Sequence, residues 1–155
     1  MTIALLLLTA AFASVATAQQ RMEYICETSD GSPYLHNINE LIDNLRADDK
    51  SPPVCNFATN GCGETVRQWS GEGGAVFMVC GSAMRCSASP QGLGCSGYGC
   101  NGRPVKGLAN YLEDIRDECK GKDSNGDERA GGSVRFVFES DGRLVSELKL
   151  FSAPG

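Results

Sequence analysis

The sequence predicts an α+β fold: a two-layer sandwich in which a mostly antiparallel sheet of four to five strands carries two helices on one face and is stabilised by disulfides. Three observations lead to this prediction. Two amphipathic helical patterns alternate with short apolar strands, the chain ends in a hairpin pattern, and eight cysteines are spread along it. A helix with one apolar stripe must bury that stripe, and a sheet face is a common partner.

The first 18 residues have the composition of a secretory signal peptide. Ala4 to Leu8 is apolar, small residues follow, and Ala16-Thr17-Ala18 has the A-x-A form that signal peptidase accepts. A membrane anchor is the weaker interpretation, because the apolar stretch is shorter than the roughly 18 residues that a spanning helix needs. We expect cleavage before Gln19, residues 19–155 as a single secreted, extracellular domain, and no stable membrane insertion.

The cysteines all follow the predicted cleavage site, which is typical of a disulfide framework in a secreted chain. They are Cys26, Cys55, Cys62, Cys80, Cys86, Cys95, Cys100 and Cys119. Eight cysteines allow 105 pairings, and the sequence does not choose among them. A zinc site is disfavoured, because no C-x-x-C pair occurs and the single histidine, His36, is far from the cysteines in sequence. We predict no metal and no cofactor.

The charge balance restricts the possible partners. The formal net charge of −5 argues against binding nucleic acid or an anionic membrane through bulk electrostatics. We expect a monomer that binds a protein target.

The first half of the domain predicts a strand, a helix and a buried strand. Residues 22–28 can form the first strand, and Ser32 and Pro33 can cap and start a helix that ends near Ala47. Its apolar stripe is Leu35, Ile38, Leu41, Ile42 and Leu45. The run Gly73 to Gly81 reads as a fully buried, central strand that Cys80 ties to another element. Trp69 is expected to pack as a lid over the core.

The middle of the chain predicts a loop and the second helix. Met84-Arg85-Cys86 is a candidate start of a short strand, and Ser87 to Arg103 is a Gly-rich loop held by Cys95 and Cys100. The glycine spacing there matches neither a P-loop nor a dinucleotide fingerprint. Pro104 to Cys119 is the second helix. Because Cys119 lies on its apolar stripe, its sulfur should bridge to a strand or loop edge beneath the helix.

Residues 120–132 are polar and predict a solvated loop. Asp123, Asn125 and Asp127 alternate as in a calcium-binding loop, but Glu128 stands where the tight-turn glycine is required and Val134 where the bidentate glutamate should be.

The chain ends in a predicted hairpin whose register follows from its buried face. A loop Ser140-Asp141-Gly142, with Gly142 left-handed, pairs Phe138 with Leu144 and Val134 with Leu148. The same register sets Arg135 against Glu147 and Glu139 against Arg143 on the outer face, which we expect to stay in water.

These segments resemble a known group of proteins. Gly73 to Gly81, Leu108 to Cys119 and Gly131 to Phe138 are similar in order and cysteine placement to killer-toxin-like effectors of filamentous fungi, including relatives of the smut-fungus killer toxins. The resemblance runs from about Cys26 to Leu150. It implies an α/β sandwich and a toxin or host-directed role. The channel-blocking members present basic residues, whereas this chain is acidic, so their mechanism does not transfer.

The sequence alone is compatible with three functions. The first is a non-enzymatic effector or toxin that binds a host or competitor target, through loops that are cross-linked and Gly-rich. The second is a small secreted hydrolase, in its sharpest form a ribonuclease, that uses His36 and Glu40 with help from Arg46 or Arg67. The third is a protease inhibitor or a wall-binding module. An inhibitor would use the loop 87–103, and a wall binder would need exposed aromatics, for which the candidates Trp69, Tyr34 and Tyr98 are few. We expect no catalytic residues.

Overall fold

The computed structural model of the chain describes residues 19–48, 50–51, 54, 60–63, 65–71, 74–82 and 105–153. The predicted signal peptide, residues 1–18, lies outside the described residues. So do Tyr98, the loop 87–103 and the candidate strand start 84–86. The same holds for the cysteines Cys55, Cys86, Cys95 and Cys100.

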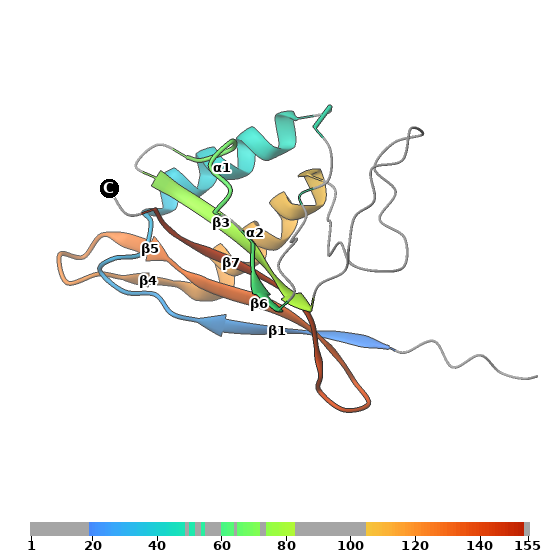
Figure 1. Ribbon diagram of the computed structural model, residues 1–155. Coiled ribbons are helices and arrows are strands. Elements are labelled where there is room, and N and C mark those ends of the chain that lie inside the picture. The colour runs from blue at the N-terminus through green and yellow to red at the C-terminus, as the bar shows by residue number, and fades with distance from the viewer. Residues whose placement is uncertain are drawn as a thin grey trace, which may run out of the picture.

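The described residues form an α+β fold, as predicted (Figure 1). A five-stranded antiparallel sheet has the order β1-β6-β7-β3-β2, and β4 and β5 form a separate two-stranded sheet. The elements are β1 (Gln20–Cys26), α1 (Leu35–Ala47), β2 (Asn60–Cys62), β3 (Ala75–Ser82), α2 (Val105–Cys119), β4 (Lys120–Lys122), β5 (Glu128–Ala130), β6 (Gly132–Phe138) and β7 (Leu144–Ser152).

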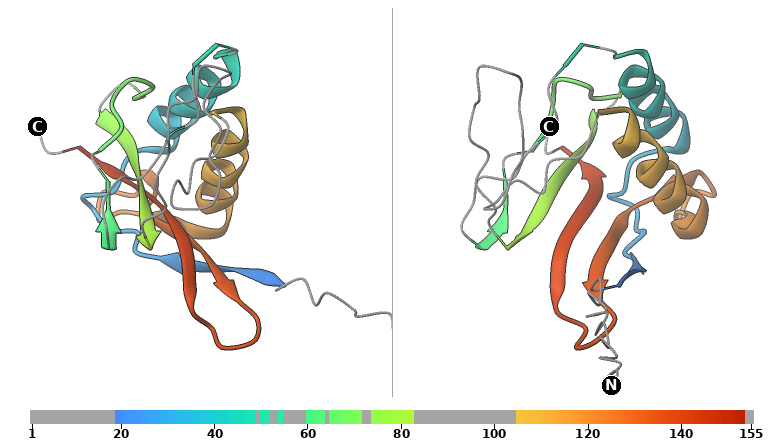
Figure 2. Two further views of the ribbon diagram at one scale, coloured as in Figure 1. Left: turned by 45° about the vertical axis from the view of Figure 1, so that its right-hand side comes forward. Right: turned by 90° about the vertical axis from the view of Figure 1, so that its right-hand side faces the viewer.

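Both helices lie on the same face of the large sheet (Figure 2). Apolar side chains at helical spacing are buried on each helix, and alternate residues of β3, β6 and β7 meet them in one core. The core contains Ile38, Leu41, Ile42, Leu45, Leu108, Leu112, Ile115, Phe77, Val79, Val134, Phe136, Leu148 and Leu150. Trp69 is also part of this core and only 7% exposed, which confirms its predicted packing role.

The predicted central strand is buried and has a strand on each side, as expected, although it is not the middle strand of the sheet. β3 lies between β7 and the short strand β2, and β7 is the middle strand. Cys80 at its end forms a disulfide with Cys62 of β2, directly opposite in the register. The apolar composition of β3 therefore reflects burial of both faces, because Val76 and Phe77, which point to opposite faces, are both almost fully buried.

The disulfide Cys26–Cys119 joins the end of β1 to the end of α2. This confirms that Cys119 bridges from the apolar face of its helix to a strand. Nearby, the hydroxyl of Thr28 donates to the carbonyl of Cys119 and accepts from the amide of Gly131 at 3.0 Å. A side chain at Gly132 would place its Cβ 2.1 Å from the carbonyl oxygen of Ile25, so only glycine allows β1 and β6 to approach this closely.

The C-terminal hairpin has the predicted register over most of its length. Val134 faces Leu148 and Arg135 faces Glu147, but a bulge between Phe136 and Val137 sets Val137 opposite Leu144. The predicted pairing of Phe138 with Leu144 is therefore wrong. The amide of Phe138 donates to the carbonyl of Arg143, so residues 139–142 form the loop, in which Gly142 is left-handed as expected (φ 68°). The predicted pairing of Glu139 with Arg143 is wrong for the same reason.

Two local predictions around the start of α1 and the end of α2 are corrected. Ser32 does not cap α1. Tyr34 is the N-cap residue, without a side-chain cap, and the Ser32 hydroxyl accepts from the amide of Ser29 instead. Residues 120–132 are not merely a loop, because β4 and β5 pair there in an antiparallel hairpin.

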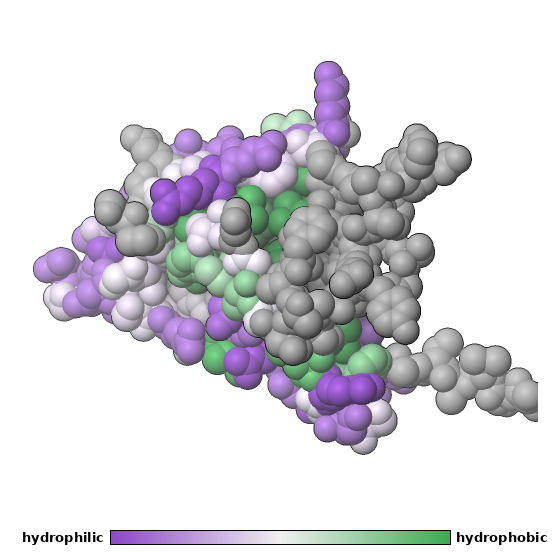
Figure 3. All heavy atoms as spheres, in the orientation of Figure 1, coloured by the Kyte–Doolittle hydropathy of each residue, from purple (hydrophilic) through white to green (hydrophobic). Residues whose placement is uncertain are grey.

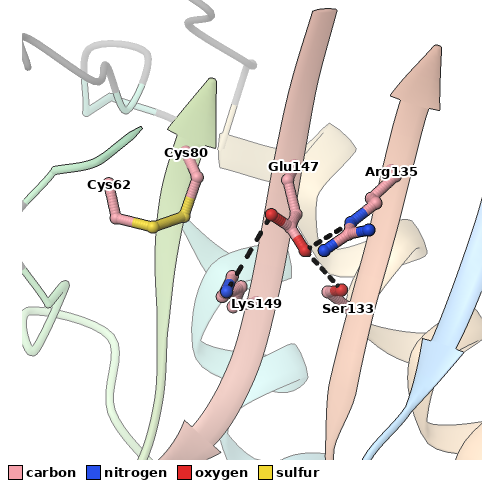
Figure 4. The surroundings of a disulfide bond; sticks show 6 residues. All are labelled: Cys62, Cys80, Ser133, Arg135, Glu147 and Lys149. Carbon is pink, nitrogen blue, oxygen red and sulfur yellow. Dashed lines mark hydrogen bonds and ion pairs between the residues drawn. A yellow bond between two sulfur atoms is a disulfide. The ribbon is translucent and has the colours of Figure 1, made fainter. Parts of the chain in front are cut away.

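The sheet face turned away from the helices is less wet than predicted. Glu147 accepts hydrogen bonds from Ser133 at 2.7 Å and from Arg135 at 3.0 Å, and Lys149 lies 3.9 Å from its other oxygen (Figure 4). The Glu147 side chain is 6% exposed, whereas that of Arg135 is 42% exposed. A carboxylate this well buried requires its hydrogen-bonding partners to stay in place.

We predict that Arg135→Met destabilises the protein more than Lys149→Met. Loss of Arg135 leaves a buried carboxylate without its cationic hydrogen bond, at a cost of about 1.5–3 kcal/mol. Loss of Lys149, which makes no hydrogen bond to Glu147, should cost under about 1 kcal/mol. Urea unfolding of the two variants measures this difference. Equal losses would show that Glu147 does not depend on Arg135.

We also predict that the two described disulfides stabilise the fold unequally. Cys26 and Cys119 are 93 residues apart and Cys62 and Cys80 are 18 apart. Loop-closure entropy then predicts that replacing the first pair by Ala costs about 4–5 kcal/mol and the second about 3 kcal/mol. Denaturant titration of the two paired variants tests this order, and a larger loss from the Cys62–Cys80 pair would contradict it.

Candidate functional site

An open hollow lies between the start of α1 and the turn that joins β4 to β5. Its volume is about 600 Å³, and its described lining residues are Tyr34, Leu35, His36, Gly126, Asp127 and Glu128. We call it the Tyr34 hollow. Figure 1 shows the β4–β5 hairpin and the start of α1 at the same end of the molecule, and hydrophilic residues cover the β4–β5 end in Figure 3.

Tyr34 is held in place by contacts on its backbone and its ring. Its backbone forms an antiparallel bridge with Arg129 of β5, and its carbonyl accepts the first helical hydrogen bonds of α1, from Asn37 and Ile38. The Tyr34 ring stacks on His36, with centroids 5.4 Å apart and planes 16° apart. The Arg129 guanidinium carbon lies 3.6 Å from the Tyr34 ring centroid. The ring is thus fixed before any ligand arrives.

Arg129 is itself fully engaged inside the protein. Its Nε donates to Asp123 at 2.5 Å and its Nη1 donates to the carbonyl of Ser32 at 2.6 Å. The side chains of Arg129 and Asp123 are 11% and 1% exposed. The bond from Arg129 lowers the pKa of Asp123, and Asp123 in turn raises the pKa of Arg129. This cation is therefore committed to the fold and not to a ligand.

The turn 123–127 is organised by carboxylates that accept backbone amides. Asp123 accepts from the amides of Asn125 and Asp127, both at 2.9 Å, and Asp30 accepts from the amide of Ser124 at 2.9 Å. These bonds help to lower the pKa of both carboxyl groups. Asp123 thus acts as a turn residue and partner of Arg129, and the calcium-like alternation in the sequence has a structural explanation. In the described residues, no group of three or more His, Cys, Asp and Glu is placed to hold a metal.

His36 and Glu40 both lie on α1, four residues apart as expected, but only one of the residues that the hydrolase hypothesis combined lines the Tyr34 hollow. His36 is exposed and lines the hollow, whereas Glu40 does not line it. Arg46 pairs with Glu113 of α2 at 2.5 Å, and Arg67 lies before Trp69, outside the hollow. Instead, His36 shares the hollow with Asp127 and Glu128.

Sequence reasoning missed the acidic side of this hollow. In the sequence, Asp127 falls in an incomplete calcium pattern and Glu128 interrupts that pattern, so neither residue indicates a hollow. The run Asp123-Ser124-Asn125-Gly126-Asp127 is a strong turn signal, which could have indicated a hairpin. The position of this hairpin beside Tyr34 depends on contacts between residues roughly 95 positions apart in sequence, such as Tyr34 and Arg129, and no local sequence signal indicates it.

A second hollow of about 710 Å³ lies at the other end of α1. Its described lining includes Asn44, Asp48, Lys50, Gln68 and Trp69. Asp48 accepts hydrogen bonds from the amides of Ser51 and Lys50 and from Trp69 Nε1, which lower its pKa. Since Trp69 is buried and its polar atom is already bonded, it does not offer a ring face for stacking a sugar.

Comparison of the chain with protein-family models, curated proteins and solved structures found no match. The chain is therefore a small disulfide-bonded α+β protein, and the likeness to killer-toxin-like effectors stays a prediction. Its disulfides are consistent with an extracellular protein. None of the helices in the described ranges is long and apolar enough to cross a membrane.

We predict that Arg129→Met loosens the hollow. The variant removes the partner of Asp123 and the cation over Tyr34, so the melting temperature should fall and the amides of Asn125 and Asp127 should exchange with solvent at least about tenfold faster. Hydrogen exchange followed by NMR measures this.

Arg143→Met is the matched control, because Arg143 is 71% exposed and lies 3.8 Å from Asp141. It should leave exchange in the turn 123–127 unchanged. Equal effects of the two variants would mean that Arg129 does not hold the turn.

Proposed function

We propose that this protein is a secreted, non-enzymatic effector or toxin that acts by binding a host or competitor protein through the Tyr34 hollow. The observation that carries the proposal is the Tyr34–His36 stack, which faces an open hollow and is held by Arg129. Binding surfaces favour aromatic residues that are ordered before the partner arrives, because little conformational entropy is then lost on binding. The killer-toxin-like resemblance supports the same role.

The secreted hydrolase remains the second candidate, because His36 lies in one hollow with two carboxylates. Two features weigh against its ribonuclease form. No side chain of the described residues hydrogen-bonds to the His36 ring, whereas a catalytic histidine is usually oriented by a partner. The carboxylates of Asp127 and Glu128 would also repel a phosphate, and the adjacent cation Arg129 is engaged elsewhere.

The test applies the oxidised protein from Gln19 onward to plant leaf tissue and to competing yeast and filamentous fungi. We expect cell death or growth arrest with the native protein, loss of the response after reduction and alkylation, and loss with His36→Ala. Asn110→Ala, an exposed change on α2, is the matched control and should remain active.

Two results would contradict this proposal. One is the absence of any response in all targets. The other is cleavage of RNA by the native protein that disappears in His36→Ala while the circular dichroism spectrum is unchanged, which would favour the hydrolase.

A further inference from the structure

The charges of the Tyr34 hollow are unbalanced. Asp127 and Glu128 are exposed; Asp127 interacts with Arg129 only through its charge, and Lys122 lies opposite Glu128 in the β4–β5 register without a close ion pair among the described residues. The adjacent cation, Arg129, is held by Asp123 and the carbonyl of Ser32. The hollow therefore presents two negative charges beside an aromatic stack.

The same protein shows how such surroundings hold a guanidinium. Arg129 lies over the ring of Tyr34 while its Nε binds a carboxylate of the neighbouring turn. A planar guanidinium suits this arrangement, because it stacks on aromatic rings and donates in a fork to carboxylates. His36 with Asp127 and Glu128 offers an incoming group the same two kinds of contact, a ring and carboxylates, at the solvent-facing side.

We propose that the Tyr34 hollow binds an arginine side chain of a basic segment on the partner protein, with its guanidinium stacked on His36 and paired with Asp127 and Glu128. This inference rests on the proposed binding function and names the chemistry of its ligand. The charge of the hollow selects a cation, and the exposed ring favours a flat cation over the compact ammonium of lysine.

The single histidine provides a direct readout, because its ring signals in the NMR spectrum report on this hollow alone. The native protein is titrated with a tetra-arginine peptide, a tetra-lysine peptide and a tetra-citrulline peptide. Citrulline keeps the shape of arginine without its charge. We expect saturable shifts of the His36 ring signals with arginine, smaller shifts with lysine and none with citrulline.

Two double variants separate the hollow from the overall charge. Asp127→Asn/Glu128→Gln should weaken binding of the arginine peptide about fivefold or more. Asp43→Asn/Glu139→Gln changes the net charge equally at exposed carboxylates outside the hollow and should leave the affinity unchanged.

The proposal is overturned if citrulline binds as well as arginine, if both double variants weaken binding equally, or if the arginine peptide causes no shift at about 30 mM, several times the dissociation constant of about 6 mM that roughly 3 kcal/mol of exposed contacts gives. The cell assay distinguishes failure of the proposed effector function from failure of the arginine inference. If Asp127→Asn/Glu128→Gln stays active on cells, the binding function stands and the arginine inference falls. If the peptide binds as expected but no cell responds, the inference stands and the effector role falls.

Discussion

The two segments that build the Tyr34 hollow both start at the Cys26–Cys119 disulfide. From Cys26 the chain runs to Tyr34 and His36, and from Cys119 it runs through β4 to Asp127, Glu128 and Arg129. The disulfide fixes the starting points of both segments, and Thr28 adds hydrogen bonds to the end of α2 and to the start of β6. Two segments that are far apart in sequence thus start side by side at this disulfide. The contact between Arg129 and the Tyr34 ring joins them again further along.

The use of charge in this region explains why the hollow stays negative. Arg129 pairs with the carboxylate of Asp123, both side chains are largely buried, and this ion pair stabilises the turn 123–127. The next two acidic residues, Asp127 and Glu128, follow in the same short hairpin and form no close ion pair with a described cation, although Lys122 lies opposite Glu128 in the register. Neighbouring like charges in partly shielded surroundings repel each other, and an incoming cation relieves that repulsion. Arg129 pairs with Asp123 and so does not neutralise Asp127 and Glu128, which explains both the buried ion pair and the negative charge of the hollow.

The helices and most of the register were predictable because their signals are periodic. The stripes of α1 and α2 recur every three to four residues, and the alternation of Val134 and Leu148 sets the hairpin. The bulge before Val137 had no such signal. β4 and β5 are three residues long and, apart from Ala130, consist of charged residues and glycine, so no apolar pattern marks them. The hollow was not predictable either, because its two sides meet through a disulfide whose pairing the sequence leaves open and through long-range contacts such as the bridge between Tyr34 and Arg129.

The energetics of the hollow indicate its place in a larger interface. Each exposed ion pair contributes roughly 0–1 kcal/mol, and a cation over an exposed ring adds about 0.5–1 kcal/mol. Two carboxylates and one imidazole then supply at most about 3 kcal/mol, which is short of the roughly 4 kcal/mol that a millimolar affinity requires. The Tyr34 hollow alone therefore gives specificity for a cation but only weak affinity. Tight binding requires contacts around the hollow that exclude water from the ion pairs, so the inserted arginine sets the orientation and identity of the partner while the surrounding surface supplies most of the affinity.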